Sequence, residues 1–333
     1  MAPGAHRGRT ALVTGITGQD GSFLAELLLA EGYRVVGTVK EAPGSPLGAS
    51  EHLRDRVELR YADLLDPCSL GTAVAEARPD ELYHLAAPSF VPDSWERPAL
   101  TIQAIAAATA ALLEAVRDYS PHTHTFVAVS SMIFGDAPES PQREQTPCRP
   151  QNPYADAKLA ARQITAQLRD RAEIYACSGI LYNHESERRP ESFVTRKISR
   201  AAAAIKLGLE QEVVLGDLDA IRDWSFAGDV VRGAWLMLRQ DAPDDYILAS
   251  GVGRTVKEFA EAVFAHLDLS ASDHIRVDPE LVRPPEPTPL IGDPTHARVR
   301  LGWHPTHTFE QLVQRMVDAD LKALAARAQP KGQ

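Results

Sequence analysis

A tyrosine and a lysine four positions apart, Tyr154 and Lys158, are the residues of this chain whose types and spacing point most directly to chemistry. On a helix, residues four apart share a face, so the lysine ammonium can lie beside the tyrosine phenol. A neighbouring cation favours the phenolate and lowers a tyrosine pKa from its usual value of about 10. Such a tyrosine can take a proton from an alcohol while a nicotinamide ring takes the hydride. The same spacing also arises by chance in many helices, so the prediction of an alcohol-oxidising site depends on the rest of the chain.

A glycine-rich turn at the start of the chain supports that prediction. The strand expected at Thr10–Thr14 leads into glycines at three-residue spacing, and a helix is expected at 21–31, ending before Gly32. A dinucleotide fold needs glycine here for a tight turn and for close approach of the backbone to a pyrophosphate. The predicted cofactor contacts in the turn are Gly15, Thr17, Gly18, Gln19, Asp20 and Gly21.

Strands and helices alternate over the first half of the chain. Further strands are expected at 33–39, 57–61, 81–85 and 125–130, and helices near 66–77, 92–118 and 152–172. This alternation predicts an α/β fold with a Rossmann-type, doubly wound parallel sheet. After about residue 180 the pattern loosens, with helices near 192–208, 228–240, 255–267 and 308–326. We therefore expect an NAD(P)-binding domain at 1–180 and a smaller mixed α/β substrate lobe at 181–330, intertwined with the first.

The composition excludes several classes of function. The chain has 333 residues, 44% of them hydrophobic, and a net charge of -10, which argues against nonspecific nucleic-acid binding and against an anionic membrane surface. Its three cysteines, Cys68, Cys148 and Cys177, have neither metal-ligand spacing nor a disulfide pattern. We expect a cytoplasmic protein with no metal site.

The choice between NAD and NADP is left open by the sequence. An acid at the end of the second strand would bind a ribose 2′-hydroxyl, and a base would accept a 2′-phosphate. Val39 occupies the acid position, followed by the base Lys40 and then Glu41. Asp63-Leu64 is expected either to contact the adenine or to begin a helix. Lys40, Asp63, Leu64, Leu85, Ala86 and Ala87 complete the predicted cofactor contacts, together with Tyr154 and Lys158.

With Ser130 ahead of Tyr154 and Lys158, the chain resembles the extended short-chain dehydrogenases/reductases. Further motifs resemble the GDP-mannose 4,6-dehydratases in particular, over nearly the whole chain. These motifs are the segments 11–22, 183–186, 193–197, 215–216, 222–224, 283–286, 292–295 and 301–303.

The resemblance implies a nucleotide-sugar substrate, GDP-linked as in this family, and a role for each matching residue. Ser130 would hold the sugar hydroxyl, Tyr154 would act as the base, and Lys158 would tune it. The implied substrate contacts are Ser89, Asn183, Val194, Lys197, Arg222, Arg283 and Glu286. Arginine forks suit phosphate oxygens, which fits a diphosphate substrate in an acidic protein. The resemblance also implies a homodimer through the helices near 99–118 and 152–170, with a tetramer as an alternative.

The chain departs from this family at one decisive position. In the segment 130–135, Met132 stands where the dehydratases have a glutamate. That glutamate would remove the C5 proton and help the C6 hydroxyl to leave, which a thioether cannot do. Replacements suggested by proximity in sequence are Ser131, Asp93, Asp136 and Glu144. Pro88 and Phe90 also replace polar residues, which predicts a less polar sugar pocket, and the loop 40–50 lacks the family's paired arginines.

Three hypotheses arise for the activity. The first is a dehydratase-like lyase with altered acid/base chemistry, acting through transient C4 oxidation of a nucleotide-linked sugar. The second is a C4 epimerase, or a dehydrogenase or 4-ketosugar reductase, which needs no group at C5. The third, of another class, is a catalytically idle cofactor-binding protein, against which the joint presence of Ser130, Tyr154 and Lys158 argues.

Overall fold

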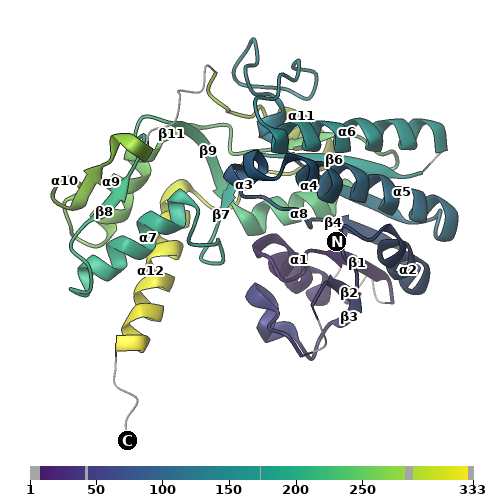
Figure 1. Cartoon of the computed structure of the whole chain (residues 1–333), viewed down its shortest axis with the longest axis horizontal. Coiled ribbons are helices and arrows are strands. Elements are labelled where there is room, and N and C mark those ends of the chain that lie inside the picture. Colours follow the sequence, from purple (N-terminus) through teal and green to yellow (C-terminus); the bar gives the residue numbers. More distant parts are fainter. Residues whose placement is uncertain (1–7, 42–43, 173, 282–287, 329–333) are drawn as a thin grey trace, which may run out of the picture.

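A seven-stranded parallel sheet forms the centre of the molecule in the computed structural model, which describes residues 8–41, 44–172, 174–281 and 288–328 (Figure 1). The order of its strands is β10-β6-β5-β4-β1-β2-β3, and every neighbouring pair is parallel. The strands are β1 (Thr10–Thr14), β2 (Arg34–Val39), β3 (Glu58–Tyr61), β4 (Glu81–His84), β5 (His124–Ser130), β6 (Ala176–Leu181) and β10 (Tyr246–Leu248). The chain reverses its direction of travel across the sheet between β1 and β4, and ligands of such folds bind at the carboxyl ends beside that reversal. The predicted doubly wound fold is confirmed.

Helices cover both faces of this sheet. On one side lie α1 (Gln19–Ala30) and α8 (Ala227–Met237), and on the other α2 (Pro67–Ala77), α5 (Ala108–Tyr119) and α6 (Pro153–Ala172). Leu12, Val36 and Leu82 on the sheet pack against α2 and α5 in one buried apolar cluster. The expected helix at 21–31 begins slightly earlier, and Gly32 follows it with φ +85°, as predicted for a glycine that ends a helix.

The helix predicted near 92–118 is broken, which corrects the sequence-based expectation. It consists of α3 (Val91–Glu96), α4 (Pro98–Ile102), a π-helical turn at Gln103–Ala107, and α5. Arg97 adopts an extended φ of -134° because the following proline disfavours helical backbone at the residue before it. The stretch Pro98–Tyr119 is long and apolar enough to cross a membrane by composition alone, but 56% of its most apolar window is buried inside the protein. It packs on α2 and α6, as a core helix does.

The C-terminal part of the chain adds two small sheets and several helices, at the left of Figure 1. β7 (Asn183–Glu185), β9 (Ile221–Phe226) and β11 (Gly253–Thr255) form one sheet, and β8 (Val213–Leu215) pairs with β12 (Ile275–Val277). The helices there are α7 (Val194–Lys206), α9 (Val256–His266), α10 (Ala271–His274) and α12 (Phe309–Ala328). The remaining helix, α11 (Thr295–Leu301), packs on α8 and β10 beside the large sheet. The domain boundary at residue 180 stays a prediction. Two elements that follow it in sequence belong to the first half of the structure, because α8 packs against the large sheet and β10 is one of its strands.

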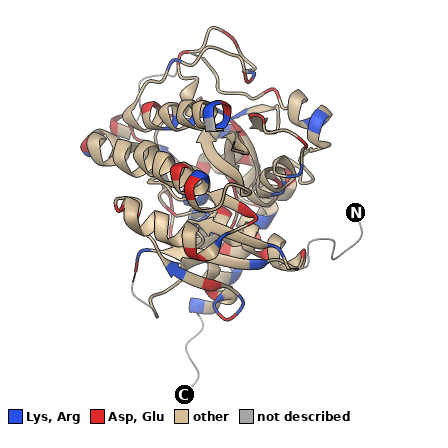
Figure 2. Ribbon diagram, turned by 90° about the vertical axis from the view of Figure 1, so that its right-hand side faces the viewer, with Lys and Arg blue, Asp and Glu red and all other residues tan. Residues whose placement is uncertain are grey.

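Charged residues of both signs are interspersed along the helices, strands and loops, as Figure 2 shows. The net charge of -10 is thus spread over many elements rather than gathered in one acidic segment. A local group of cations, where one occurs, is therefore a specific feature of its site.

Candidate active site

The glycine-rich turn lies between β1 and α1 at the reversal point of the sheet. Gly15 has φ +75°, and a Cβ there would lie 2.9 Å from backbone atoms of Ala86 after β4. A Cβ on Gly21 would lie 2.2 Å from the carbonyl oxygen of Gly15. Gly18 is the N-cap of α1, has extended backbone, and would place its Cβ no closer than 3.4 Å to any neighbour. Gly15 and Gly21 are thus required by packing, whereas Gly18 leaves open space at a helix N-terminus suited to an anion.

This difference predicts that two alanine substitutions affect different properties, stability at Gly21 and cofactor binding at Gly18. Gly21→Ala is expected to lower the free energy of unfolding of the ligand-free protein by about 1–3 kcal/mol, the usual cost of overpacking. Gly18→Ala is the matched control: it should leave that stability almost unchanged but weaken cofactor binding, because its methyl group faces the open side of the turn. Urea unfolding and cofactor titration measure the two effects. Equal stability of the two variants would contradict this interpretation.

The segment after β4 is held against the turn by two residues that the sequence analysis missed. The Ala86 N–H donates to the Thr14 hydroxyl (3.2 Å), which is also 2.8 Å from His84 Nδ1. Burial lowers the pKa of His84 to about 3, with the charge of Lys158 acting in the same direction, so its ring is neutral. Leu85, Ala86 and Ala87 thereby follow the carboxyl end of β4, beside Gly15, as a cofactor contact requires.

Ser130, Tyr154 and Lys158 come together at the carboxyl end of β5. Ser130 is the last residue of β5, and its hydroxyl accepts a hydrogen bond from the Met132 N–H (3.3 Å). Tyr154 and Lys158 lie one turn apart at the start of α6, where the Asn152 side chain accepts from the Ala155 N–H (2.9 Å). The Lys158 Nζ donates to the Ala128 carbonyl (2.7 Å) and lies 5.9 Å from the centre of the Tyr154 ring. The predicted face-sharing of the tyrosine and lysine is confirmed.

The predicted lowering of the Tyr154 pKa is wrong. Burial raises the pKa of Tyr154, and the hydrogen bond with Ser130 and the charge of Arg189 only partly oppose that effect. Burial likewise lowers the pKa of Lys158 to about 8, although the charge of Asp20 acts the other way. Sequence spacing places a cation near the phenol, but it carries no information about how far both groups are removed from water.

The low pKa of Lys158 predicts a pH dependence of stability. In the unfolded chain Lys158 has its ordinary pKa of 10.5, and in the folded protein about 8. Between these values the unfolded state binds a proton that the folded state does not, so the free energy of unfolding should rise with pH from about 8 to 10. Replacing Lys158 by methionine, which keeps the apolar stem, should flatten that rise in urea titrations. Identical slopes for both proteins would show that Lys158 titrates normally.

Gln19 and Asp20, predicted to bind the cofactor, have their side chains engaged within the protein. Asp20 pairs with His184 (Oδ2 to Nε2, 2.8 Å), and the Gln19 amide accepts from the Ser186 hydroxyl (2.7 Å). Burial is the largest influence on both groups and alone would raise the pKa of Asp20 and lower that of His184. Their mutual attraction, together with hydrogen bonds from Gln19 to the carboxylate and between the imidazole and the Tyr182 backbone, leaves the carboxyl pKa lowered and the imidazole pKa raised. This pair joins α1 to β7 and was not predicted; only chain folding brings residues 20 and 184 together.

Met132 lies in an apolar setting next to Tyr154. It is half-buried and packs against the cluster that contains Tyr154, Ile105, Ala157 and Ala161. Among the suggested replacements for the family's glutamate, Glu144 is buried and accepts from the Ile247 N–H (2.9 Å), so it stabilises β10 instead. Ser131 is buried, Asp136 is half-buried and Asp93 is exposed on α3.

Of the predicted substrate contacts, Asn183, Val194, Lys197 and Arg222 lie on β7, α7 and β9 in the second half of the chain, and Ser89 lies in the first half. Asn183 begins β7 and pairs in register with Trp224 of β9, the strand that carries the half-buried Arg222. Val194 and Lys197 are exposed in the first turns of α7, and Ser89 is exposed between β4 and α3. Arg283 and Glu286 lie outside the described residues.

A contact between an arginine and two aromatic rings, which the sequence did not predict, lies near the predicted substrate contacts. The Arg189 guanidinium lies 3.6 Å from the centre of the Phe193 ring, which in turn packs edge-on against Phe90 at 5.9 Å. The charge of Arg189 acts on Tyr154, Asp20 and His184, which places it beside the candidate catalytic group. Phe90 therefore belongs to an aromatic contact near the candidate catalytic group, and the loss of polarity in the sugar pocket stays a prediction.

The residues expected to discriminate between cofactors line a pocket of about 590 Å³ at the ends of β2 and β3. Its lining includes Lys40, Glu41, Arg60 and Tyr61. Asp63 does not begin a helix, because the N-cap of α2 is Asp66; the Asp63 carboxylate instead accepts from the Leu65 N–H (2.9 Å). Asp63 and Leu64, both half-buried, remain predicted adenine contacts.

Comparison with known proteins shows extensive similarity. The family model for GDP-mannose 4,6 dehydratase matches residues 12–316. GDP-mannose 4,6 dehydratase 2 of Arabidopsis thaliana is 44% identical over 326 residues, which covers 94% of this chain and 87% of that protein.

Two solved structures are also similar. RMD from Pseudomonas aeruginosa, complexed with NADPH, has a TM-score of 0.81 at 25% identity and covers 95% and 99% of the two chains. UDP-glucose 4-epimerase from Thermus thermophilus, complexed with NAD, has a TM-score of 0.80 at 27% identity and covers 93% and 98%.

Proposed function

The chain belongs to the GDP-mannose 4,6-dehydratase family of NAD(P)-dependent nucleotide-sugar-modifying enzymes, and we propose that it oxidises a GDP-linked hexose transiently at C4. The observation that carries this proposal is the meeting of Ser130, Tyr154 and Lys158 beside the glycine-rich turn. Arg222 on the adjoining lobe supplies a cation for a diphosphate, Asn183 supplies an amide to the same phosphates, and Lys197 lies along the nucleoside.

Oxidation at C4 is the first step of the proposed reaction. The nicotinamide cofactor, when bound, supplies the acceptor for the C4 hydride. The Ser130 hydroxyl positions O4 and the Tyr154 phenolate takes the proton of that hydroxyl, so the alcohol becomes a ketone. Lys158, whose pKa is about 8, is about half protonated near that pH. In its protonated form, Lys158 stabilises the Tyr154 phenolate.

Water loss is the second step that we propose, which makes the protein a lyase. The C4 ketone acidifies the C5 proton; its removal and the departure of the C6 hydroxyl with a proton give one molecule of water and a C5–C6 double bond. Delivery of that hydride to C6, which the bound nicotinamide would supply, together with a proton to C5 would give a 4-keto-6-deoxy sugar. The Met132 thioether can neither remove the C5 proton nor donate a proton to the leaving C6 hydroxyl. Solvent, or the Ser131 hydroxyl, takes the place of the family's glutamate in this proposal.

The apolar packing of Met132 also favours a second candidate, a C4 epimerase or 4-ketosugar reductase. Return of the hydride to C4 needs only Ser130, Tyr154 and Lys158, and no acid/base group near C5. The two candidates share their first half-reaction and differ in the fate of the ketone that it forms.

Mass spectrometry of products formed in heavy water, across a panel of GDP-, ADP-, CDP- and UDP-sugars, separates these functions. Loss of one water molecule with deuterium at C5 supports the lyase. A product of unchanged mass but altered stereochemistry supports the epimerase. No turnover of any nucleotide sugar, despite tight cofactor binding, would contradict both the lyase and the epimerase and would support an idle cofactor-binding protein.

We propose NADP as the preferred cofactor. No acid stands at Val39 to hold a ribose 2′-hydroxyl, while Lys40 and Arg60 line the pocket at the ends of β2 and β3. Lys40→Ala is therefore expected to weaken NADPH binding about tenfold, the effect of losing one charge-assisted hydrogen bond, and to change NADH binding less than about twofold. Arg56→Ala, at an exposed arginine nearby, is the control for a general change in charge. Equal losses for both cofactors would contradict a 2′-phosphate site.

We also propose a homodimer, which the exposed apolar side chains of α3 and α4 support. Trp95 is 64% exposed, Leu100 40% and Ile102 48%, and these helices lie beside α6. Burying such side chains against a second copy is favourable by about 25 cal/mol per Å². Sedimentation velocity should show a dimer that Leu100→Glu converts to a monomer, whereas Leu209→Glu, at an exposed leucine of the other lobe, should not.

A further inference from the structure

Asp223 is a buried carboxylate that the proposed oxidation does not use. It follows Arg222 on β9 and is 0% exposed. Its Oδ1 accepts from the N–H (2.8 Å) and the hydroxyl (2.5 Å) of Ser250, and its Oδ2 accepts from the N–H groups of Gly251 (2.9 Å) and Gly292 (3.2 Å). Burial raises the pKa of this carboxyl although the hydrogen bonds oppose that effect. All four donors are neutral, so this carboxylate is costly to bury and stabilises one particular arrangement of its partners.

The four donors lie along both edges of β9. The turn at 250–252 leads into β11, which pairs with one edge of β9. Leu290 forms a parallel bridge with Arg222. Because β11 occupies the first edge at Arg222, Leu290 and the nearby Gly292 lie at the opposite edge, where β7 also pairs. The Asp223 carboxylate thus joins three separate segments at the level of Arg222.

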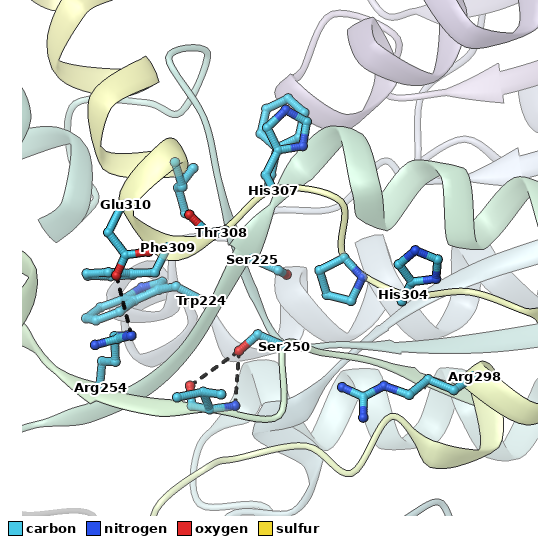
Figure 3. Close-up of a pocket in the computed structure, with 14 residues that line it drawn as sticks. Trp224, Ser225, Ser250, Arg254, Arg298, His304, His307, Thr308, Phe309 and Glu310 are labelled. Atoms are coloured by element: carbon cyan, nitrogen blue, oxygen red, sulfur yellow. Dashed lines mark hydrogen bonds and ion pairs between the residues drawn. The ribbon is translucent and has the colours of Figure 1, made fainter.

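Strand pairing at Arg222 is electrostatically unfavourable. The residue directly opposite it on β11 is Arg254, and like charges in that position repel each other. The largely exposed Glu310, 3.7 Å from Arg254, offsets this repulsion only in part (Figure 3). Successive side chains of a strand point to opposite faces, so Asp223 lies on the far face from the two arginines. Its hydrogen bonds to both edges therefore oppose separation of the strands at Arg222.

Gly292 connects this arrangement to the second predicted phosphate contact. A Cβ on Gly292 would lie 2.8 Å from the Tyr182 ring, so the two residues are in close contact. Tyr182 immediately precedes Asn183, the first residue of β7. The hydrogen bond from Gly292 to Asp223 thus links the strand that carries Arg222 to the residue beside Asn183.

We propose that Asp223 is a positioning residue for the diphosphate of the substrate, because it fixes Arg222 relative to Asn183. This inference rests on the proposed function, in which Arg222 contacts the diphosphate. An asparagine at position 223 has one acceptor oxygen and turns an NH₂ group toward N–H donors, so it cannot keep all four hydrogen bonds. Either the turn at 250–252 or Gly292 then loses its partner, and Arg222 is no longer held in one place.

Isothermal titration of the full chain with GDP and with guanosine tests the proposal. Asp223→Asn and Arg222→Gln should each weaken GDP binding about tenfold, the effect of losing one hydrogen bond to a charged group. Guanosine lacks the diphosphate, so its affinity should change less than about twofold. In the double variant the two losses of GDP affinity should not add, because Asp223 acts through Arg222.

Asp229→Asn is the matched control. Asp229 is also a buried aspartate (3% exposed), and it accepts from the N–H groups of Thr306 (2.9 Å) and His307 (3.0 Å), neither of which is a predicted substrate contact. This variant should lower the unfolding temperature as Asp223→Asn does, but leave GDP affinity unchanged. Should Asp223→Asn fail to fold, Ser250→Ala removes one donor and keeps the carboxylate, and it should weaken GDP binding about threefold.

The outcomes separate this inference from the proposed function. Unchanged GDP affinity in Asp223→Asn, or in Ser250→Ala where that variant replaces it, would overturn the positioning role while a loss in Arg222→Gln left the diphosphate contact intact. Unchanged GDP affinity in Arg222→Gln would overturn both. Additive losses in the double variant, or an equal loss of guanosine affinity, would show that Asp223 supports the fold in general and does not act through Arg222.

Discussion

Replacing Tyr154 by phenylalanine is expected to lower turnover of the nucleotide sugar by about 10²–10⁴-fold, the usual contribution of a general base. The ring is buried among Ile105, Ala157 and Ala161, and phenylalanine keeps that packing while removing only the hydroxyl. Cofactor affinity and the unfolding temperature should therefore stay close to those of the wild type. Steady-state kinetics, cofactor titration and thermal unfolding measure the three quantities.

The raised pKa of Tyr154 adds a second readout to this prediction. Because burial raises the pKa of the phenol, the wild-type rate should increase with pH until the phenolate forms. Residual activity in Tyr154→Phe should lack that increase. Tyr119→Phe, at a tyrosine that is 52% exposed, is the matched control and should change neither rate nor pH profile. If Tyr154→Phe keeps more than a small fraction of wild-type turnover, another group must be the base.

Replacing Met132 by glutamate is expected to have the second large effect, a gain of 4,6-dehydration. A carboxylate at this position stands two residues after Ser130 and packs beside Tyr154, where the C5 proton and the C6 hydroxyl of the sugar should lie. If position 132 is where the acid/base group acts, as we propose, a carboxylate there should raise the rate of water loss by about 10²–10⁴-fold. Mass spectrometry of the product in heavy water, with deuterium located at C5, measures the gain.

Met132→Gln provides the control for this gain. Glutamine has the shape and polarity of glutamate but cannot exchange a proton, so it should give no increase in dehydration. Both variants place a polar group in a half-buried apolar setting, and their unfolding temperatures should fall to a similar extent. Equal rates for the glutamate and glutamine variants would show that Phe90 and its neighbours, rather than the missing carboxylate, limit the reaction.

The two predictions also bear on the choice between lyase and epimerase. If the wild-type protein already dehydrates its substrate, Met132→Glu should form the same product at a higher rate. A wild-type epimerase should instead acquire a new product of lower mass. Tyr154→Phe stops both, because the first half-reaction is common to them.

The fold class, the glycine-rich turn and the candidate catalytic group were all predictable from the amino-acid sequence. These features depend on short spacings: glycines three apart, a tyrosine and a lysine four apart, and alternating apolar segments. Local backbone geometry converts such spacings into structure almost independently of the rest of the chain. The break at Pro98 could have been predicted from the same rules and was missed.

Which distant residues meet, and how much water they retain, became visible only in the folded chain. The pairing of Asp20 with His184, the contact of His84 with Thr14, and the entry of β10 into the large sheet join positions far apart in sequence. The pKa of Tyr154 is raised rather than lowered because burial outweighs its polar neighbours. Desolvation and long-range contact are properties of the folded chain as a whole, and no local pattern encodes them.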